Sequence, residues 1–331
     1  MGHAPLFARP RRRGQRSGRA VARLALLAGT WLTLPSAAQD ADAPLSAAPE
    51  APAVSTLASD TPGTAALTGD SLVDRGRYLF DAALCAGCHT AEDGMALAGG
   101  RPIESPFGTF YTSNITPDAD YGIGDWSDED FVRALSEGIS PAGKHYYPAF
   151  PYTSFTKLTR EDMLAIKAYL GTVEPVAQPN RPHDLVWFAG WRWPLGIWKA
   201  IYFESGTLSP DASRSETWNR GAYLSEAAAH CAECHSPRDL LGGIKQSERY
   251  AGADDGIEGG GTPNITPDKE TGIGAWTADM LAFYLEIGME PDGDFAGGAM
   301  AHVIEQGTGR LSAADRAAIA EYILSLPPIS R

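Results

Sequence analysis

Two short segments of the 331-residue chain carry the residue types best suited to chemistry. Cys85-Ala86-Gly87-Cys88-His89 and Cys231-Ala232-Glu233-Cys234-His235 share the spacing Cys-x-x-Cys-His. Two thiols at this spacing can form thioethers with the vinyl groups on one edge of a porphyrin, and the imidazole that follows can bind the iron. The spacing therefore predicts two covalently attached haem c groups. The predicted site residues are Cys85, Cys88, Cys231 and Cys234 for attachment and His89 and His235 for the two iron ions.

The cysteine count limits the other uses of these thiols. All four cysteines of the chain lie in the two motifs, so none is left for a separate disulfide, a catalytic thiolate or a cysteine ligand. A zinc site or a redox-active dithiol is the alternative interpretation of paired cysteines. The two pairs lie far apart in sequence and each is followed at once by His, which favours haem. The motifs therefore predict an electron-transfer protein rather than an independent enzyme.

The N-terminal residues have the pattern of an export signal. Seven arginines precede an apolar run from Leu24 to Leu34, and Ser36-Ala37-Ala38 fits a cleavage site. The run is shorter than the roughly 20 residues of a membrane-spanning helix. A retained anchor is the alternative to cleavage. The pattern predicts a periplasmic protein, with association at the outer face of the inner membrane as an option.

The net charge of −14 indicates the kind of partner to expect. Removal of the arginine-rich signal makes the remaining chain still more acidic. Such a surface disfavours nucleic acid and anionic membranes and favours basic docking patches on other proteins. The expected partners are redox proteins, namely a dehydrogenase subunit, a terminal oxidase or a soluble cytochrome, with peripheral membrane association as a further option.

Similar segments suggest how the chain is organised. Asn114-Ile115-Thr116-Pro117-Asp118 recurs 150 residues later as Asn264-Ile265-Thr266-Pro267-Asp268. Apolar periodicity predicts helices over 72–82, 127–138, 159–170 and 312–324. Gly76 lies inside the first of these, and we expect the helix over 159–170 to pack closely against it. The predicted domains are a signal peptide (1–38), an Ala/Pro-rich linker (39–70), a first cytochrome c domain (71–175), a connector (176–214) and a second cytochrome c domain (215–331).

Several motifs resemble those of a known family. Besides Cys-x-x-Cys-His, they are Pro106-Phe107-Gly108-Thr109, Asn114-Ile115-Thr116-Pro117, Gly124-Asp125-Trp126-Ser127 and Tyr147-Pro148-Ala149-Phe150-Pro151-Tyr152. With these motifs the chain resembles the cytochrome c subunits of bacterial membrane-bound alcohol, gluconate and related dehydrogenases over roughly residues 71–328. The resemblance implies an all-α fold, a tandem repeat of two class I cytochrome c-like domains joined by an aromatic-rich connector.

The resemblance also bears on the sixth iron ligands. Met300 precedes the final helix, where a class I cytochrome c places its methionine ligand, so Met300 is the expected ligand of the second haem. Related sequences often have Met where this chain has Phe150, which cannot bind iron. Three interpretations stay open for the first haem: an open or water-bound site, ligation by His145, or ligation by Met95. An open site would suit a diheme peroxidase-like oxidoreductase, which is the alternative function.

Two further features allow two interpretations each. We expect the Asn-Ile-Thr-Pro segments and nearby tryptophans to line the haem edge and bind propionates; a turn against a core aromatic is the other interpretation, and the two are compatible. The aromatic-rich part of the connector, His183 to Phe203, contains four tryptophans. It is either a strap packed over both domains or a docking patch for a membrane or an enzyme partner.

Overall fold

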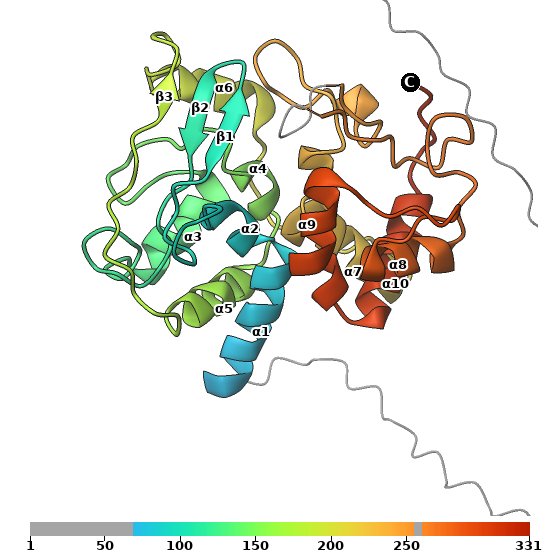
Figure 1. Cartoon of the computed structure of the whole chain (residues 1–331), viewed down its shortest axis with the longest axis horizontal. Helices are drawn as coiled ribbons and strands as arrows, with labels where there is room; N and C mark the ends of the chain where they lie inside the picture. The colour runs from blue at the N-terminus through green and yellow to red at the C-terminus, as the bar shows by residue number, and fades with distance from the viewer. Residues whose placement is uncertain (1–68, 255–259) are drawn as a thin grey trace, which may run out of the picture. The chain divides into compact units, whose positions relative to one another are not determined.

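The computed structural model describes residues 69–254 and 260–331, which belong to one compact unit, Pro62–Arg331 (Figure 1). The expected signal peptide (1–38) and almost all of the expected linker (39–70) lie outside these residues. The domain boundaries stay predictions. Below, residues 69–175 are called the N-terminal half and residues 215–331 the C-terminal half.

The helices and strands follow one another along the chain with short connections. The α-helices are α1 (Gly69–Ala82), α2 (Cys85–His89), α3 (Asp128–Glu137), α4 (Tyr152–Phe155), α5 (Arg160–Leu170), α6 (Pro194–Tyr202), α7 (Glu216–Tyr223), α8 (Ala278–Ile287), α9 (Gly298–Gln306) and α10 (Ala313–Leu324). A π-helical turn, η1 (Leu224–Ala228), and 3-10 turns η2 (Cys231–Glu233), η3 (Gln246–Glu248) and η5 (Thr308–Arg310) complete the helical elements that are described. The strands are β1 (Pro102–Ser105), β2 (Gly108–Tyr111) and β3 (Asp184–Leu185).

The predicted helices over 72–82, 127–138, 159–170 and 312–324 are confirmed as α1, α3, α5 and α10. Their ends follow local chemistry. Ser127 and Asp130 form a reciprocal capping box at the start of α3. Gly138 ends α3 with a φ of 60°, a conformation that glycine adopts without steric cost. Thr159 caps α5 in a related way, because its side chain accepts a hydrogen bond from the Asp162 N–H.

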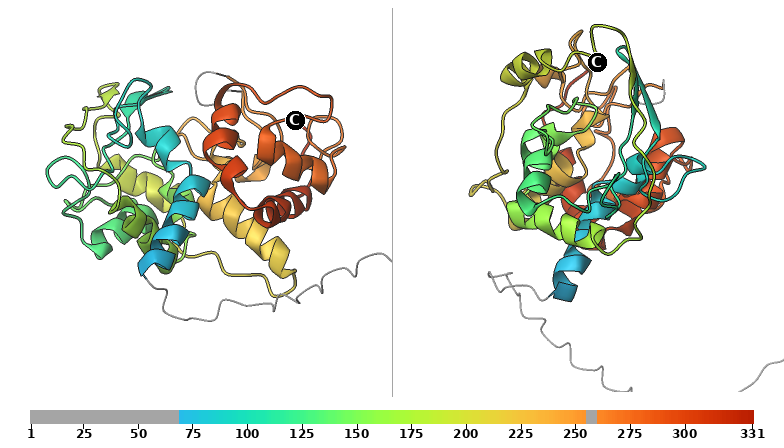
Figure 2. Two further views of the ribbon diagram at one scale, coloured as in Figure 1. Left: turned by 60° about the horizontal axis from the view of Figure 1, so that its bottom comes forward. Right: turned by 90° about the vertical axis from the view of Figure 1, so that its left-hand side faces the viewer.

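Glycine allows helices to approach closely in both halves. A Cβ atom added at Gly76 of α1 would lie 1.9 Å from the carbonyl oxygen of Ala165 in α5, so the expected packing of these helices is confirmed. A Cβ atom at Gly221 of α7 would lie equally close to the carbonyl oxygen of Ala318 in α10. Figure 2 shows α7 and α10 lying side by side in this way.

The predicted all-α fold is wrong, because the chain also contains a three-stranded antiparallel sheet in the order β1-β2-β3. β1 and β2 form a hairpin that places Pro102 opposite Tyr111. β3 comes from the connector and pairs Leu185 with Gly108. Gly108 has a φ of 108° and a Cβ there would lie 2.4 Å from the Asp184 carbonyl, so only glycine lets β3 approach. The fold is mixed, and residues 69–254 and 260–331 do not show the predicted tandem repeat.

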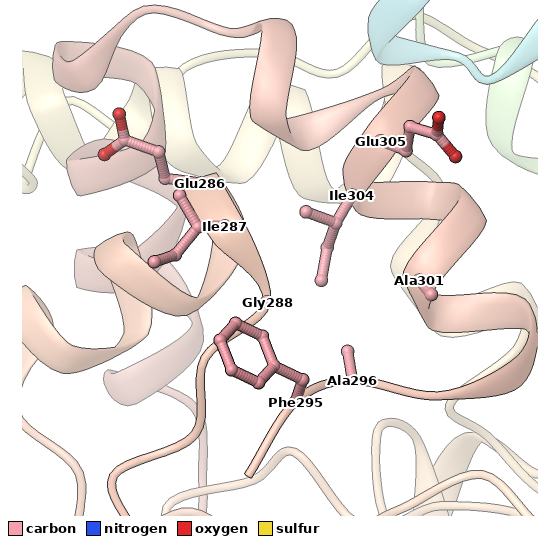
Figure 3. A pocket seen from close by; sticks show the side chains of 8 residues that line it. All are labelled: Glu286, Ile287, Gly288, Phe295, Ala296, Ala301, Ile304 and Glu305. Atoms are coloured by element: carbon pink, nitrogen blue, oxygen red, sulfur yellow. The ribbon is translucent and has the colours of Figure 1, made fainter. Parts of the chain in front are cut away.

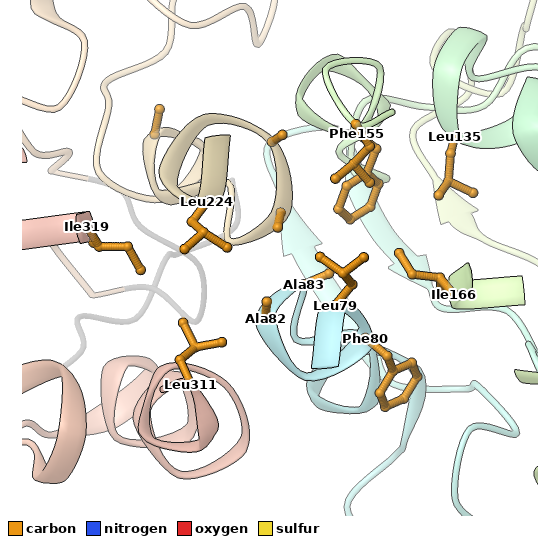
Figure 4. Close-up of a cluster of buried hydrophobic side chains, with 14 of the residues drawn as sticks. Leu79, Phe80, Ala82, Ala83, Leu135, Phe155, Ile166, Leu224, Leu311 and Ile319 are labelled. Atoms are coloured by element: carbon orange, nitrogen blue, oxygen red, sulfur yellow. The ribbon is translucent and has the colours of Figure 1, made fainter. Parts of the chain in front are cut away.

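The buried hydrophobic side chains form one cluster that contains residues from both halves. Its members come from α1, α5, η1 and α10, among other elements, so the two halves share a core. Burial of apolar side chains is the main favourable contribution to folding, and a shared core couples the stability of the halves. The side chains labelled in Figure 4 are Leu79, Phe80, Ala82, Ala83, Leu135, Phe155, Ile166, Leu224, Leu311 and Ile319.

Two aspartates also join the halves through crossed hydrogen bonds. Asp315, in the first turn of α10, accepts from Arg220 of its own half at 2.8 Å and from Tyr78 of the N-terminal half at 2.6 Å. Asp162, in the first turn of α5, accepts from Arg75 of its own half at 2.5 Å and from Tyr223 of the C-terminal half. Each half therefore donates one tyrosine hydroxyl to a carboxylate of the other half. We call these the crossed Tyr–Asp pairs.

Glu226 in η1 is a buried carboxylate with four donors. It accepts from Lys157 of the N-terminal half at 2.5 Å and from Arg249 at 2.6 Å. The hydroxyls of Tyr250 and Tyr322 donate to its other oxygen at 2.5 and 2.8 Å. Burial alone would raise the pKa of Glu226, but the charges of Arg249 and Lys157 outweigh burial and lower the pKa to about 2.

We expect acid to destabilise the protein through Glu226. Its folded pKa lies below the ordinary carboxyl value, so its contribution is present above pH 4.5 and is lost as the pH falls toward 2. The shift corresponds to about 3 kcal/mol of unfolding free energy. Glu226→Gln should lower the free energy of unfolding at pH 7 by about 3 kcal/mol, because two partly buried cations lose their partner.

Denaturant unfolding of the haem-loaded protein between pH 7 and pH 2.5 measures both effects. Glu270→Gln, at an exposed position, serves as the control and should leave both unchanged. Equal acid sensitivity in wild type and Glu226→Gln would contradict this account.

Candidate functional site

Each Cys-x-x-Cys-His motif begins with a sharp change of chain direction. Leu84 precedes α2 with a φ of 53°, and His230 precedes η2 with a φ of 40°. Non-glycine residues rarely adopt this left-handed conformation, and where they do the surrounding structure must enforce it. At both positions the turn ends one helical element and starts the short helix that carries the first cysteine. The backbone thereby presents both thiols of a motif from one turn of helix.

The two motif histidines are held in the same tautomer. Nδ1 of His89 lies 2.6 Å from the carbonyl oxygen of Ser113, and Nδ1 of His235 lies 2.9 Å from that of Pro263. A carbonyl only accepts, so Nδ1 carries the proton and Nε2 keeps its lone pair. Burial lowers the pKa of both histidines, although the carbonyl contact opposes that effect. Neutral imidazole with an oriented Nδ1–H is the form that binds iron.

The Asn-Ile-Thr-Pro segments hold these carbonyls in place. Asn114 is buried, and its side-chain oxygen accepts from the Thr116 N–H at 2.9 Å and the Thr116 hydroxyl at 2.7 Å. Its amide group donates to the Val176 carbonyl at 2.8 Å. Asn264 makes the same bonds with Thr266 and donates to the Ile329 carbonyl. The Asn side chains are thus engaged in fixing a turn, as the turn interpretation of these segments expects.

The thiols have the properties of attachment points. The four cysteines, all among the described residues, form no disulfide. Burial raises the pKa of Cys85 and Cys231 to about 12 and that of Cys234 to about 11. Among residues 69–254 and 260–331, no group of three or more His, Cys, Asp or Glu is arranged to hold a metal ion. The zinc interpretation therefore has no support from the described residues.

The structure brings the two motifs close together. Burial is the main cause of the raised pKa of Cys234, and charge on Glu233 and on Cys88 of the other motif adds to it. Nε2 of His230 lies 3.3 Å from the Ala83 carbonyl at the end of α1, and its ring centroid lies 5.4 Å from that of Phe155. The segment that opens the second motif therefore packs on the N-terminal half. In turn, α9 of the C-terminal half packs against α2.

The candidate sixth ligands are placed differently. Met300, in α9, is half-buried and packs against the core, whereas Met95 is 59% exposed. Phe150 packs against Tyr146 and Phe155, with ring centroids 5.5 and 5.7 Å away. His145 lies beneath α6, where its Nδ1 is buried without a hydrogen-bond partner among the described residues.

A cavity of about 230 Å³ lies between the end of α8 and α9 (Figure 3). Its volume is below the roughly 300–1,000 Å³ of typical ligand pockets, so this cavity alone does not define a porphyrin site. Its walls are mostly apolar, and the residues that line it are Glu286, Ile287, Gly288, Phe295, Ala296, Ala301, Ile304 and Glu305.

Some residues near the motifs were missed by sequence reasoning. A guanidinium reaches the backbone of each motif: Arg101 donates to the Gly87 carbonyl, and Arg238 donates to the Glu233 carbonyl at 3.1 Å. The Glu233 side chain is nearly buried and binds the N-terminal half. No local pattern identifies these residues, because their partners are set by the fold.

The connector contacts both halves and also exposes aromatic side chains. In α6, Lys199 is buried and donates to the carbonyls of Glu137 and Gly138 at 2.5 and 2.9 Å. Trp198 donates to the Leu241 carbonyl in the C-terminal half at 2.9 Å. Both contacts fit the strap interpretation. On the outer side Trp187 is 75% exposed, and Phe188, Trp191, Trp193, Ile197 and Ile201 are exposed as well.

Taken together, the cysteines without disulfides, the oriented imidazoles and the turns that hold them fit covalent haem. Comparison with known proteins agrees. The cytochrome c family model matches residues 73–174. A diheme cytochrome c-type protein of Cereibacter sphaeroides is 38% identical over 329 residues, which cover 96% of this chain and 99% of that protein. The chain belongs to the cytochrome c family. Within that family it is a diheme c-type cytochrome, with two covalently bound haem c groups.

Other relatives are subunits of larger enzymes. The fructose dehydrogenase cytochrome subunit of Gluconobacter japonicus is 43% identical over 77% of this chain, and 52% of that subunit is covered. The gluconate 2-dehydrogenase cytochrome c subunit of Pantoea cypripedii is 38% identical, with 60% of its length covered. The chain thus matches just over half the length of these two relatives. These names are consistent with electron transfer.

Within the described ranges, 69–254 and 260–331, no helix combines the length and hydrophobicity that crossing a membrane requires.

Replacing the thiols of one motif should remove one haem. The double variant Cys85→Ser/Cys88→Ser should carry one covalent haem instead of two, because serine cannot form the thioether. Cys231→Ser/Cys234→Ser is the matched variant and should lose the other haem. The mass of the denatured protein after maturation with the haem-attachment machinery measures the count. Two haems retained in either variant would contradict the assignment of that motif.

Proposed function

We propose that this diheme cytochrome relays single electrons in the periplasm, from a dehydrogenase or another donor to the respiratory chain. The observation that carries the proposal is the proximity of the two motifs within one unit, where His230, which precedes the second motif, contacts the Ala83 carbonyl and α9 packs against α2. Groups attached at both motifs would be held at a fixed, short separation. The shared core and the crossed Tyr–Asp pairs keep that separation constant.

The chain's own residues divide the work of binding. Cys85 and Cys88 hold one haem and Cys231 and Cys234 the other, while His89 and His235 each direct Nε2 to an iron. When bound, each haem supplies an iron couple that gains or loses one electron. Ser113 and Pro263 keep the histidines in the tautomer that binds iron. Burial of the motif residues limits the reorganisation of water around the site.

Met300 is the proposed sixth ligand of the haem held by the second motif. Its half-buried position in α9 and the place of its segment before α10 support this role. Thioether ligation raises a haem potential. For the first haem, Phe150 offers no ligating atom, and His145, Met95 or an open site stay as alternatives. The two haems would then differ in potential.

The proposed donor is a dehydrogenase, and the exposed side of the connector supports contact with a partner protein. Lys199 is the one charged residue of α6, and it faces inward. The outer side of α6 is therefore apolar, with Trp193, Ile197 and Ile201 exposed at helical spacing. Aromatic side chains with few charges are typical of the centre of protein interfaces. The net charge of −14 disfavours an anionic lipid surface as the alternative.

Export to the periplasm is proposed from the N-terminal sequence. The arginine-rich start, the apolar run and the Ser36-Ala37-Ala38 segment support it. Attachment of haem c normally takes place outside the cytoplasm, which agrees with that location. Association with the outer face of the inner membrane would follow from binding to a membrane-bound dehydrogenase.

Substitution of Met300 tests the proposed ligand. Met300→Leu should move one of the two midpoint potentials to a lower value and leave the other nearly unchanged, because leucine cannot bind iron. Met280→Leu, at an exposed position of α8, is the matched control and should move neither. Potentiometric titration followed by visible absorption measures both midpoints. Two unchanged midpoints in Met300→Leu would overturn the assignment.

Mixing experiments distinguish the relay from a peroxidase-like enzyme. The reduced protein should transfer electrons rapidly to a basic mitochondrial cytochrome c, and the rate should fall as salt is added, because the net charge of −14 steers a basic acceptor. Addition of hydrogen peroxide should cause no sustained turnover. Stopped-flow absorption records both reactions. Rapid, repeated consumption of peroxide would instead support an open catalytic site at the first haem.

A further inference from the structure

Glu233 occupies an unusual place for a carboxylate. It lies inside the second motif, between Cys231 and Cys234, and its side chain is only 9% exposed. Charged side chains are rarely this buried unless they are paired. Haem attachment does not require an acidic residue before the second cysteine, because the first motif has Gly87 at that position.

The Glu233 carboxylate accepts all of its hydrogen bonds from three neighbouring side chains. One carboxylate oxygen accepts from the hydroxyls of Thr153 and Ser154 at 2.7 and 2.9 Å. The other accepts from the Arg238 guanidinium at 2.6 Å. The Arg238 guanidinium can only donate, and its positive charge at this distance favours the ionised carboxylate. Glu233 therefore carries a negative charge.

These contacts cross from one half to the other. Thr153 and Ser154 belong to α4, which begins two residues after Phe150. Phe150 is the position at which related sequences often have a methionine. Glu233 itself is followed directly by Cys234 and His235. Its charge is consequently placed between the segment that carries the second haem and the segment expected to cover the first haem. Tyr152 of α4 is fully buried as well, and Glu233 together with burial raises its pKa.

We propose that Glu233 is a positioning residue with an electrostatic effect, which fastens the second motif to α4 and lowers the reduction potential of the haem held by the second motif more than that of the first. The inference rests on the proposed function and goes beyond it by naming a residue that sets the potential difference between the two haems. Gly87 provides no such charge at the first motif. The asymmetry between Glu233 and Gly87 is a difference in fixed charge rather than in ligation.

The direction of the effect follows from charge. Reduction of a haem iron adds one negative charge to the site. A fixed carboxylate nearby opposes that addition, and the opposition is strong because the surroundings are buried. Arg238 compensates only in part, since its side chain is 36% exposed and water screens its charge. The net electrostatic effect of Glu233 and Arg238 is therefore that of a negative charge, which lowers the reduction potential.

Two substitutions of opposite sign test this inference. Glu233→Gln should move at least one midpoint potential to a more positive value, because the amide keeps the shape but not the charge. Arg238→Gln should move the same midpoint to a more negative value, because the carboxylate is then uncompensated. Glu270→Gln makes the same charge change at an exposed position and should move neither midpoint. The readout is potentiometric titration of the purified, haem-loaded full chain.

A third variant separates charge from fastening. Thr153→Val/Ser154→Ala removes both hydroxyl donors and leaves the carboxylate in place. It should lower the unfolding midpoint in denaturant, and the haem potential should stay equal or become more negative. A structural role alone would make all three variants less stable without potential shifts of opposite sign for Glu233→Gln and Arg238→Gln.

The outcomes are distinguishable from failure of the proposed function. Wild type without two reversible one-electron couples would remove the relay itself. If the wild type has two reversible couples and Glu233→Gln leaves both midpoint potentials unchanged, or lowers one, only the role of Glu233 would be overturned. If Glu233→Gln matures poorly, Arg238→Gln decides alone, and an unchanged or more positive midpoint in that variant would overturn the inference.

Discussion

The crossed Tyr–Asp pairs are the constraint on which the geometry of the site depends. Tyr78 and Tyr223 lie on the helices that lead into the two motifs, and each donates to a carboxylate in the other half. Hydrogen bonds to a charged acceptor are each worth about 1.5–3 kcal/mol. Because α1 leads directly into Cys85, and α7 continues through η1 toward Cys231, the two pairs fix where both motifs lie. The shared core then fills the space between them.

Local chemistry made much of the helical structure predictable. The caps at Ser127 and Thr159 depend on side chains three residues away, so the sequence displays them directly. The close approach at Gly76 was also predictable, because glycine inside a helix usually has a packing reason. The two haem-attachment motifs were predictable from the Cys-x-x-Cys-His spacing alone. Such features are predictable because the residues that determine them lie within a few positions of one another in the sequence.

Features that depend on distant partners were not predictable in this way. β1 and β2 form a hairpin around Pro106 and Phe107. The Pro-Phe-Gly sequence there is both a motif of the family and a turn signal between two short strands. The pairing of β2 with β3 joins residues far apart in sequence, and no local pattern reveals it. Glu233 is the clearest case among site residues. Its donors Thr153 and Ser154 lie 80 and 79 positions away, so its role exists only in the folded chain.

The connector gives the molecule an optical property. Trp187, Trp191 and Trp193 are exposed on one surface, out of eight tryptophans in the chain. Indole emission moves to shorter wavelength when water around the ring is replaced by protein. The same rings lie on a body that absorbs visible light through its cofactors, so their emission also depends on distance from those absorbers. The chain therefore reports coverage of this surface through its intrinsic fluorescence, without any attached dye.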